Sequence, residues 1–329
     1  MYNSGQKNAF LDSIHLESGK RNWAIDIFNT TENMEVERGV DLAMLSGEDV
    51  GTALCSTGAT SSVTITNRVP FIVRYKKWCA DNGIDAVVLE SSDIVYDISD
   101  NLRDMMVCSP GQLDYVARRA FPDQGGLRTM APVYRSYLWL AFSGMFEVDA
   151  VQVRERDINL RDLVVNVQGR WYELQPEAIP DIKAAIKLDE IDRNMSGKIK
   201  VYHRADGDEI IRGRKIKKVL TPEQYVMKTL RATVHGAMKE IGRNGMSYVK
   251  IRKSGLFYGM LSRELKGFTP NFYTIACDDY DRDKHKEVTP VIRQRTISRG
   301  VRGYKRDYEL WKKAFESELK EEFKVEKLP

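Results

Sequence analysis

The 329-residue chain contains only four cysteines, and no two of them lie close together in the sequence. This scatter argues against a disulfide framework or a zinc site and is typical of proteins from a reducing cytoplasm. No apolar run approaches the ~20 residues that a membrane-spanning helix requires, and the N-terminus MYNSGQKNAF lacks the pattern of a signal peptide. We therefore expect a cytoplasmic protein with no membrane partner.

Motifs of the common enzyme classes are also missing. The chain has no P-loop, no HExxH, no GxSxG, and no GxGxxG following a predicted strand. The four histidines, which could have indicated a metal or catalytic site, do not cluster in the sequence: His15, His203, His235 and His285. We predict no cofactor and no metal site.

Lysine and arginine are distributed unevenly, although the formal net charge is only +4. Residues 1–110 hold 9 Lys and Arg against 16 Asp and Glu, whereas residues 195–253 hold 15 against 5. A second basic cluster follows at 293–313. Basic charge concentrated in a few segments indicates a surface for a polyanion, with an ordinary solvated surface as the alternative.

Apolar periodicity predicts a mainly α-helical chain with a small β-hairpin, an α+β fold. Residues 40–54 and 63–82 carry apolar side chains at helical spacing, and Ser46 is a suitable cap for the first of them. The stretch CSPG at 108–111 interrupts the pattern. We therefore expect a helical N-terminal domain and a larger C-terminal domain, 1–107 and 108–329.

The C-terminal part combines helices with one clear hairpin. Val164, Val165 and Val167 precede the turn dipeptide Gln168-Gly169, which predicts a hairpin between residues 157–167 and 170–174. The polar segment 192–219 is expected to be an exposed connection with a short strand at 199–203. Helices are predicted over residues 112–120, 134–145, 176–188, 221–241, 247–265 and 305–323.

Two segments of this C-terminal part resemble signature boxes of the tyrosine recombinases (phage integrases). Residues 143–158, SGMFEVDAVQVRERDI, resemble the first box, which usually has the form T-G-x-R-x-x-E-x-x-x-L-x-x-x-D-I. About 100 residues later, YVKIRKSGLFYGML at 248–261 resembles the H-x-x-R box in an R-x-S-G variant. The order of elements matches the family over roughly residues 31–320. The resemblance implies a SAM-like core-binding domain followed by a tyrosine-recombinase-like domain.

The same resemblance implies that most catalytic positions are replaced. The first arginine, which would hold the scissile phosphate, corresponds to Phe146, and the histidine of the second box corresponds to Val249. The second arginine is present as Arg252, Arg170 lies near the position of the hairpin lysine, and Tyr304 is the best match to the nucleophile. A preorganised group facing transition-state charge is typically worth ~3–4 kcal/mol. We therefore expect no enzymatic activity, no catalytic residue, and only vestigial roles at positions 146, 249 and 304.

Ground-state binding of phosphates needs less than catalysis, since Lys and Arg contacts with counterion release are sufficient. We predict that cations of the second box, the hairpin, the segment RGRKIKK, the helix at 63–82 and the second basic cluster contact DNA. These residues are Arg252, Lys250, Lys253, Arg170, Arg212, Arg214, Lys215, Lys217, Lys218, Arg68, Arg74, Lys76, Lys77, Arg295, Arg299 and Arg302.

Within the family, the chain resembles catalytically silent proteins that repress lytic genes in SPβ-type prophages. That resemblance implies a sequence-specific repressor that binds operator sites in double-stranded DNA, in the cytoplasm of a bacterial host and associated with the nucleoid. One alternative is an active recombinase with rearranged residues, using Tyr304 or Tyr308. Another is an interaction protein that self-associates or binds a protein partner through the acidic N-terminal domain or the C-terminal helix.

Overall fold

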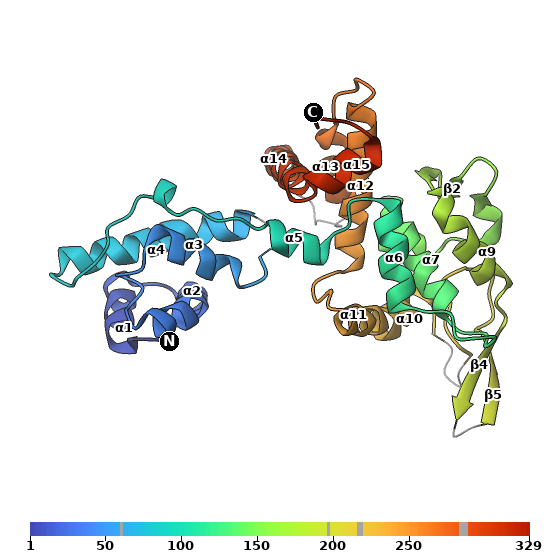
Figure 1. Ribbon diagram of the computed structural model, residues 1–329, viewed down its shortest axis with the longest axis horizontal. Helices are drawn as coiled ribbons and strands as arrows, with labels where there is room; N and C mark the ends of the chain where they lie inside the picture. Colours follow the sequence, from blue (N-terminus) through green and yellow to red (C-terminus); the bar gives the residue numbers. More distant parts are fainter. Residues whose placement is uncertain (60–61, 196–197, 216–219, 283–288) are drawn as a thin grey trace. The chain divides into compact units, whose positions relative to one another are not determined.

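The computed structural model describes residues 1–59, 62–195, 198–215, 220–282 and 289–329, with only the main chain of Ser62, Met195 and Pro222. The chain is mainly helical with two small antiparallel sheets, which confirms the predicted α+β class (Figure 1). The longer helices are α1 (Ser4–Ser13), α2 (Ser18–Arg38), α3 (Gly47–Cys55), α4 (Ser62–Asp81), α5 (Ser99–Met105), α6 (Pro110–Ala120), α7 (Ala131–Phe142), α9 (Ile179–Lys187), α11 (Arg231–Glu240), α12 (Tyr248–Glu264), α13 (Phe272–Arg282), α14 (Pro290–Ala314) and α15 (Glu316–Phe323).

The chain packs into two compact units. The first unit comprises Met1–Leu102 and Ala276–Leu310, and the second comprises Arg103–Ile275 and Trp311–Pro329. The break after Leu102 lies close to the boundary that the sequence predicts at residue 107. Nothing in the sequence indicated that residues 276–310 group with the N-terminal part. The two units are described separately below.

The core of the first unit is an aromatic cluster. Phe10 of α1, Phe28 of α2 and Tyr75 of α4 are fully buried, and their ring centroids lie 5.0 to 6.3 Å apart in largely edge-to-face contacts. Such pairs add about 0.5–1.5 kcal/mol each to the free energy of burial. Ser46 caps α3 as predicted, accepting a hydrogen bond from the Asp49 amide. No separate helix was predicted over α1 or α2, and the helix predicted at 40–54 begins only at Gly47.

The core of the second unit surrounds α7, which overlaps the helix predicted at 134–145 and contains the apolar segment YRSYLWLAF. Every residue from Arg135 to Phe142 is buried. Arg135 is the one charged side chain in that run, and its Nε donates to Asp181 Oδ1 of α9 at 2.7 Å. Trp139 Nε1 donates to the other oxygen of the same carboxylate at 3.1 Å. A buried ion pair is tolerated when further hydrogen bonds satisfy its atoms, and this one fixes α7 against α9.

Both sheets belong to the second unit. β1 (Ile158–Asn159), β2 (Val164–Val167) and β3 (Arg170–Glu173) form a three-stranded meander. Gln168 and Gly169 both have positive φ, 52° and 80°, as a two-residue turn of the predicted kind requires. The predicted strand at 199–203 is confirmed as β5 (Lys198–His203), but it pairs with β4 (Glu190–Met195), which the sequence did not indicate.

The remaining predicted helices are confirmed with two differences. The helix at 221–241 contains a π-helical turn, Val226–Leu230, between the short α10 (Pro222–Tyr225) and α11. The helix predicted over 305–323 is instead the end of α14 followed by α15, with a break at Phe315. None of the helices in the described ranges is long and apolar enough to span a bilayer.

Candidate nucleic-acid interface

The candidate site begins at the short connection after α7, where the first signature box lies. Gly144 has a φ of +82°, a conformation that glycine adopts without strain. A β-carbon there would lie 2.9 Å from Leu256 Cδ2 of α12. Phe146 then precedes the short helix α8 (Glu147–Ala150) as its N-cap residue, and its side chain is half-buried. The box therefore forms a tight connection that faces α12.

The second box lies on α12, and its small residues bring that helix close to α7. A β-carbon added to Gly255 would overlap the carbonyl oxygen of Phe142. Ser254 is buried, and its hydroxyl accepts from the Val107 amide at 3.1 Å and donates to the Lys250 carbonyl at 2.9 Å. The S-G pair of the R-x-S-G pattern thus sets the packing of α12 that positions Arg252.

Arg252 lies directly against Phe146. Its Nε donates to the Gly144 carbonyl oxygen at 2.9 Å, and its guanidinium carbon is 3.8 Å from the centre of the Phe146 ring. A cation over an aromatic face contributes about 0.5–2 kcal/mol, depending on how far the pair is removed from water. Arg252, which the sequence matches to the family's second arginine, therefore packs on Phe146, the residue that the sequence matches to the first.

The carboxylates beside Phe146 have positively charged or hydroxyl partners. Glu147 accepts from Arg231 Nε at 3.0 and 3.1 Å, and the hydroxyl of Tyr137 also donates to it. Asp149, which is 1% exposed, accepts from the Tyr172 hydroxyl at 2.7 Å. Burial and this bond to Asp149 raise the pKa of Tyr172 to about 12. Both acids are therefore engaged within the protein rather than presented to a ligand.

Two further positions of the family pattern are Arg170 and Val249. Tyr248, which precedes Val249, is buried, and its hydroxyl donates to the Met145 carbonyl at 3.1 Å. Arg170 begins β3 and is a hydrogen-bond partner of the Tyr172 hydroxyl. Val249, at the histidine position, is 67% exposed in the first turn of α12. Burial raises the pKa of Tyr248 well above its usual value, so its hydroxyl stays protonated at neutral pH. Lys250 and Lys253 are half-buried on the same helix.

The candidate nucleophiles lie on α14. Tyr304 is half-buried in the first unit, and its hydroxyl donates to the carboxylate of Asp279 on α13. Tyr308, one turn further along, is fully buried.

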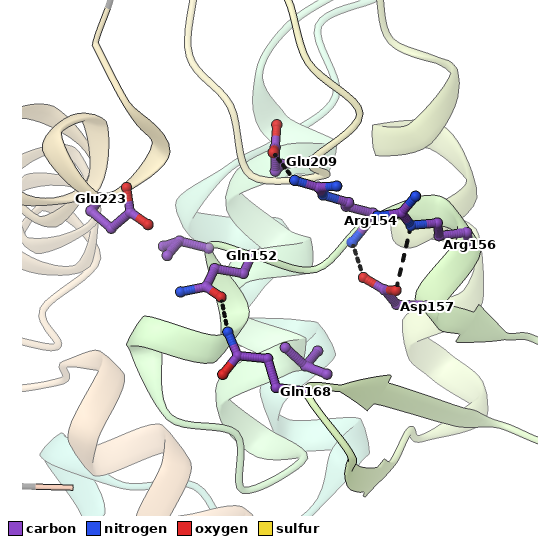
Figure 2. Close-up of a pocket in the computed structure, with 9 residues that line it drawn as sticks. Gln152, Arg154, Arg156, Asp157, Gln168, Glu209 and Glu223 are labelled. Atoms are coloured by element: carbon purple, nitrogen blue, oxygen red, sulfur yellow. Dashed lines mark hydrogen bonds and ion pairs between the residues drawn. The ribbon is translucent and has the colours of Figure 1, made fainter.

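A pocket of about 460 Å³ opens beside the β2–β3 turn (Figure 2). Gln168 of the turn donates to Gln152 across one side of it. Arg154 lines another side, with its guanidinium 3.2 Å from Glu209 and its main-chain amide 2.9 Å from Asp157. The lining is polar, and the charge of Arg154 is compensated. Among the described side chains, no group of His, Cys, Asp and Glu could hold a metal ion.

The basic segment RGRKIKK is only partly described. Arg212 is mostly covered, because its guanidinium donates to the Glu209 carbonyl at 2.7 Å and lies 3.3 Å from Asp189. Arg214 is exposed and stacks on Tyr202 of β5, and Lys215 is exposed and paired with Asp206 at 2.7 Å. The predicted contacts of Lys217 and Lys218 lie outside the described residues.

The second basic cluster forms a stripe on α14. The three arginines that were predicted to contact DNA are all exposed, and their spacing of four and then three residues places them on one face of the helix: Arg295, Arg299 and Arg302. This stripe belongs to the first unit. It adds positive charge to a unit whose N-terminal part is acidic.

One of the four predicted cations of α4 is not at the surface. Lys76 is fully buried, and its ammonium donates to the carbonyls of Ala43 at 2.9 Å and Leu45 at 2.6 Å. Burial lowers the pKa of Lys76 to about 8. The prediction that Lys76 contacts DNA is wrong, because its charge serves to hold the connection before α3. The other three cations of the helix, of which the first is half-buried and the last two are exposed, are Arg68, Arg74 and Lys77.

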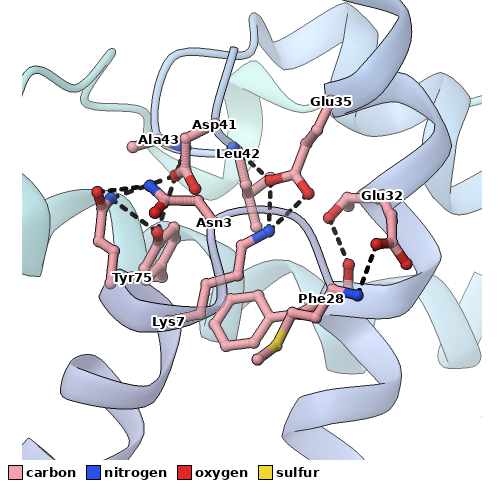
Figure 3. A network of polar contacts seen from close by, with 12 residues as sticks. Asn3, Lys7, Phe28, Glu32, Glu35, Asp41, Leu42, Ala43 and Tyr75 are labelled. Carbon is pink, nitrogen blue, oxygen red and sulfur yellow. Dashed lines mark hydrogen bonds and ion pairs between the residues drawn. The ribbon is translucent and has the colours of Figure 1, made fainter. Parts of the chain in front are cut away.

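A second buried lysine of the first unit belongs to an extended polar network (Figure 3). Lys7 lies 2.5 Å from the Glu35 carboxylate, and the amide of Leu42 donates to the same group. Nearby, the Tyr75 hydroxyl donates to Asp41 at 2.8 Å. The network ties α1, α2 and α4 to the connection before α3. Its charged residues Lys7 and Glu35 are buried, although charged residues of surface helices usually face solvent.

Sequence reasoning also missed two arginines that organise the second unit. Arg231 holds Glu147, and Arg204 is buried with its guanidinium donating to the carbonyls of Ala185, Leu188 and Ile210 at 2.6 to 2.8 Å. Burial lowers the pKa of Arg204 to about 10. No local pattern distinguishes these arginines from surface ones, because their partners are distant in sequence.

The N-terminal part of the chain is similar to a known family. Residues 1–81 match the family described as MrpR, N-terminal core-binding domain. This match covers α1 to α4 and confirms, for that part of the chain, the predicted resemblance to a core-binding domain of the integrase type. The first unit therefore contains an MrpR-like core-binding domain.

No curated protein matches the chain as a whole. Among solved structures, it is similar to the Tn1549 transposon integrase (residues 82–397) in complex with circular intermediate DNA, with 10% sequence identity and a TM-score of 0.32, covering 80% of this chain and 88% of that one.

Proposed function

We propose that this chain is a catalytically silent protein of the tyrosine-recombinase type that binds double-stranded DNA and represses transcription. The narrower form of the proposal is a repressor that maintains lysogeny of an SPβ-type prophage by occupying operator sites. The observation that carries it is the packing of Arg252 on Phe146. The supporting context is the MrpR-like core-binding domain at residues 1–81.

The packing argues against strand cleavage for a chemical reason. Transfer of a phosphoryl group to tyrosine builds negative charge on the non-bridging oxygens, and the family meets it with two arginines. Phe146 offers no charge and no donor, and the Nε of Arg252 is bonded to the Gly144 carbonyl. The acids Glu147 and Asp149 add negative charge beside this position, although both are bonded to partners. Losing a preorganised donor costs typically ~3–4 kcal/mol in the barrier.

DNA binding makes smaller demands than cleavage. It requires cations on the surface, and their contribution depends on the number of phosphates neutralised rather than on exact placement. Exposed cations occur on α4, on α14 and in the segment after β5, for example Arg74, Arg299 and Arg214. Contacts of this kind fix affinity and register, and base contacts in the major groove would supply sequence choice.

The test is binding of the purified full-length chain to promoter DNA from its own genetic neighbourhood and to a scrambled duplex of equal length. We expect tighter binding to the promoter and an affinity for both duplexes that falls with salt. Arg252→Gln should weaken binding and lower the salt slope by about 1, as expected for one phosphate contact. Lys183→Gln, which changes an exposed lysine on α9, is the matched control. Equal weak binding to both duplexes would contradict the operator model.

A further inference from the structure

The β4–β5 hairpin has one face that carries only cations, an aromatic ring and an apolar edge. Antiparallel pairing places Arg193 directly opposite Lys200, and Ile191 opposite Tyr202. Side chains of directly paired residues lie on the same face of a sheet, and Lys198 shares that face because it is two residues from Lys200. In Figure 1 the hairpin extends beyond the helices of the second unit.

A further cation joins this face from the neighbouring segment. Residues 213–215 run antiparallel to the end of β5, with the Lys215 amide donating to the His203 carbonyl at 2.8 Å. Arg214 thereby lies with its guanidinium carbon 4.5 Å from the centre of the Tyr202 ring, and Lys200 Nζ is 5.4 Å from the same ring. We call the four residues the hairpin cation face: Arg193, Lys198, Lys200 and Arg214.

The hairpin cation face has no compensating acid. All four side chains are exposed, and none forms an ion pair within the described parts of the chain. Like charges directly opposite each other destabilise a strand pair, so the Arg193–Lys200 pairing works against the hairpin itself. A surface selected for folding alone would place an acid at one of these positions.

The acids of the hairpin lie on its other face and are already neutralised. Arg128, from the connection before α7, donates from Nη2 to Asp192 Oδ1 at 2.8 Å and also holds Glu190. The hydrogen bonds from Arg128 lower the pKa of Asp192. The two faces of the hairpin therefore differ in charge. The hairpin cation face has a net positive charge, which a polyanion would neutralise.

We propose that the hairpin cation face binds the phosphate backbone of double-stranded DNA where the ribbon enters a groove. A two-stranded β-ribbon fits the major groove, which is ~12 Å wide. Lys198 and Lys200 are two residues apart on one strand, so their side chains leave the ribbon ~7 Å apart, a spacing that two separate phosphates can meet. Such contacts add affinity without choosing sequence. This inference rests on the proposed DNA-binding function and adds a contact surface distinct from Arg252.

The test compares two triple variants of the full-length chain by the salt dependence of binding to the promoter duplex. The hairpin variant is Arg193→Gln/Lys198→Gln/Lys200→Gln. The matched control, Lys183→Gln/Lys187→Gln/Lys327→Gln, removes the same charge from exposed lysines of the same unit that also form no ion pair within the described residues. Each phosphate contact contributes ~0.9 to the slope of log K against log salt. We expect the slope of the hairpin variant to fall by about 2–3, and that of the control to fall by less than about 1.

Thermal unfolding separates a lost contact from a lost fold. Because the variant removes a like-charge pairing, its melting temperature should equal or exceed that of the wild type. A slope equal to that of the control, in a folded hairpin variant, would overturn the inference while leaving the proposed function intact. Loss of self-association instead of DNA affinity would also overturn it, in favour of a protein contact. If the wild type binds no DNA, the proposed function itself fails.

Discussion

The contact between Arg252 and Phe146 leads to a prediction about coupled stability. The guanidinium lies 3.8 Å from the ring centre, and both side chains are half-buried. A cation–π pair with this degree of exposure is worth about 1 kcal/mol, and the charged hydrogen bond to the Gly144 carbonyl is worth about 1.5–3 kcal/mol. Arg252→Ala should therefore destabilise the second unit by about 2–4 kcal/mol, of which about 1 kcal/mol depends on the ring.

A double-mutant cycle isolates the part that depends on the ring. Phe146→Leu keeps an apolar side chain but removes the aromatic face, so Arg252→Ala should cost about 1 kcal/mol less in the Phe146→Leu background. Native-state hydrogen exchange of the α12 amides is a suitable assay, because it measures local opening free energies in a chain with two units. A coupling below about 0.3 kcal/mol would refute the stacking and with it the structural account of the replaced arginine.

Three further predictions concern single positions. Lys76 has a pKa of about 8 in the folded chain against an ordinary 10.5, so between these pH values the unfolded chain binds more protons and the free energy of unfolding rises with pH. In urea unfolding at several pH values, Lys76→Met should remove about 3 kcal/mol of this rise, and an unchanged pH profile would contradict the low pKa of Lys76. Gly255→Ala should destabilise the chain by at least ~2 kcal/mol in the same assay, because its β-carbon would overlap the Phe142 carbonyl oxygen, and a neutral substitution would mean that α7 and α12 are not in contact there. Tyr304→Phe should cost ~1 kcal/mol of stability by removing the bond to Asp279 and leave DNA affinity unchanged, so a large loss of DNA affinity would show a role beyond structure.

The parts of the fold that could be predicted are those with local signals. The turn at Gln168-Gly169 follows β-branched residues, and both of its residues have the positive φ that the dipeptide indicates. The cap at Ser46 and the buried segment of α7 follow from residue types within one or two turns of helix. The resemblance to the family assigned Phe146 and Arg252 to two boxes about 100 residues apart, and nothing local in the sequence predicts the contact between them.

The parts that could not be predicted depend on distant partners. Lys76 occupies a polar position of an amphipathic helix, and only the approach of the carbonyls of Ala43 and Leu45 turns it inward. β4 contains three charged residues and one amide in six positions, so its strand character comes from pairing with β5 rather than from its own composition. Grouping of residues 276–310 with the first unit likewise follows from tertiary packing.

The central claim, DNA binding without strand transfer, is tested most directly by trapping on suicide substrates. The full-length chain is incubated with nicked duplexes that carry the promoter sequence, at concentrations where binding is saturated, and covalent adducts are separated in denaturing gels. The account predicts saturated binding with no adduct, in the wild type and in Tyr304→Phe alike. An adduct that forms in the wild type and disappears in Tyr304→Phe or Tyr308→Phe would contradict it and identify a working recombinase.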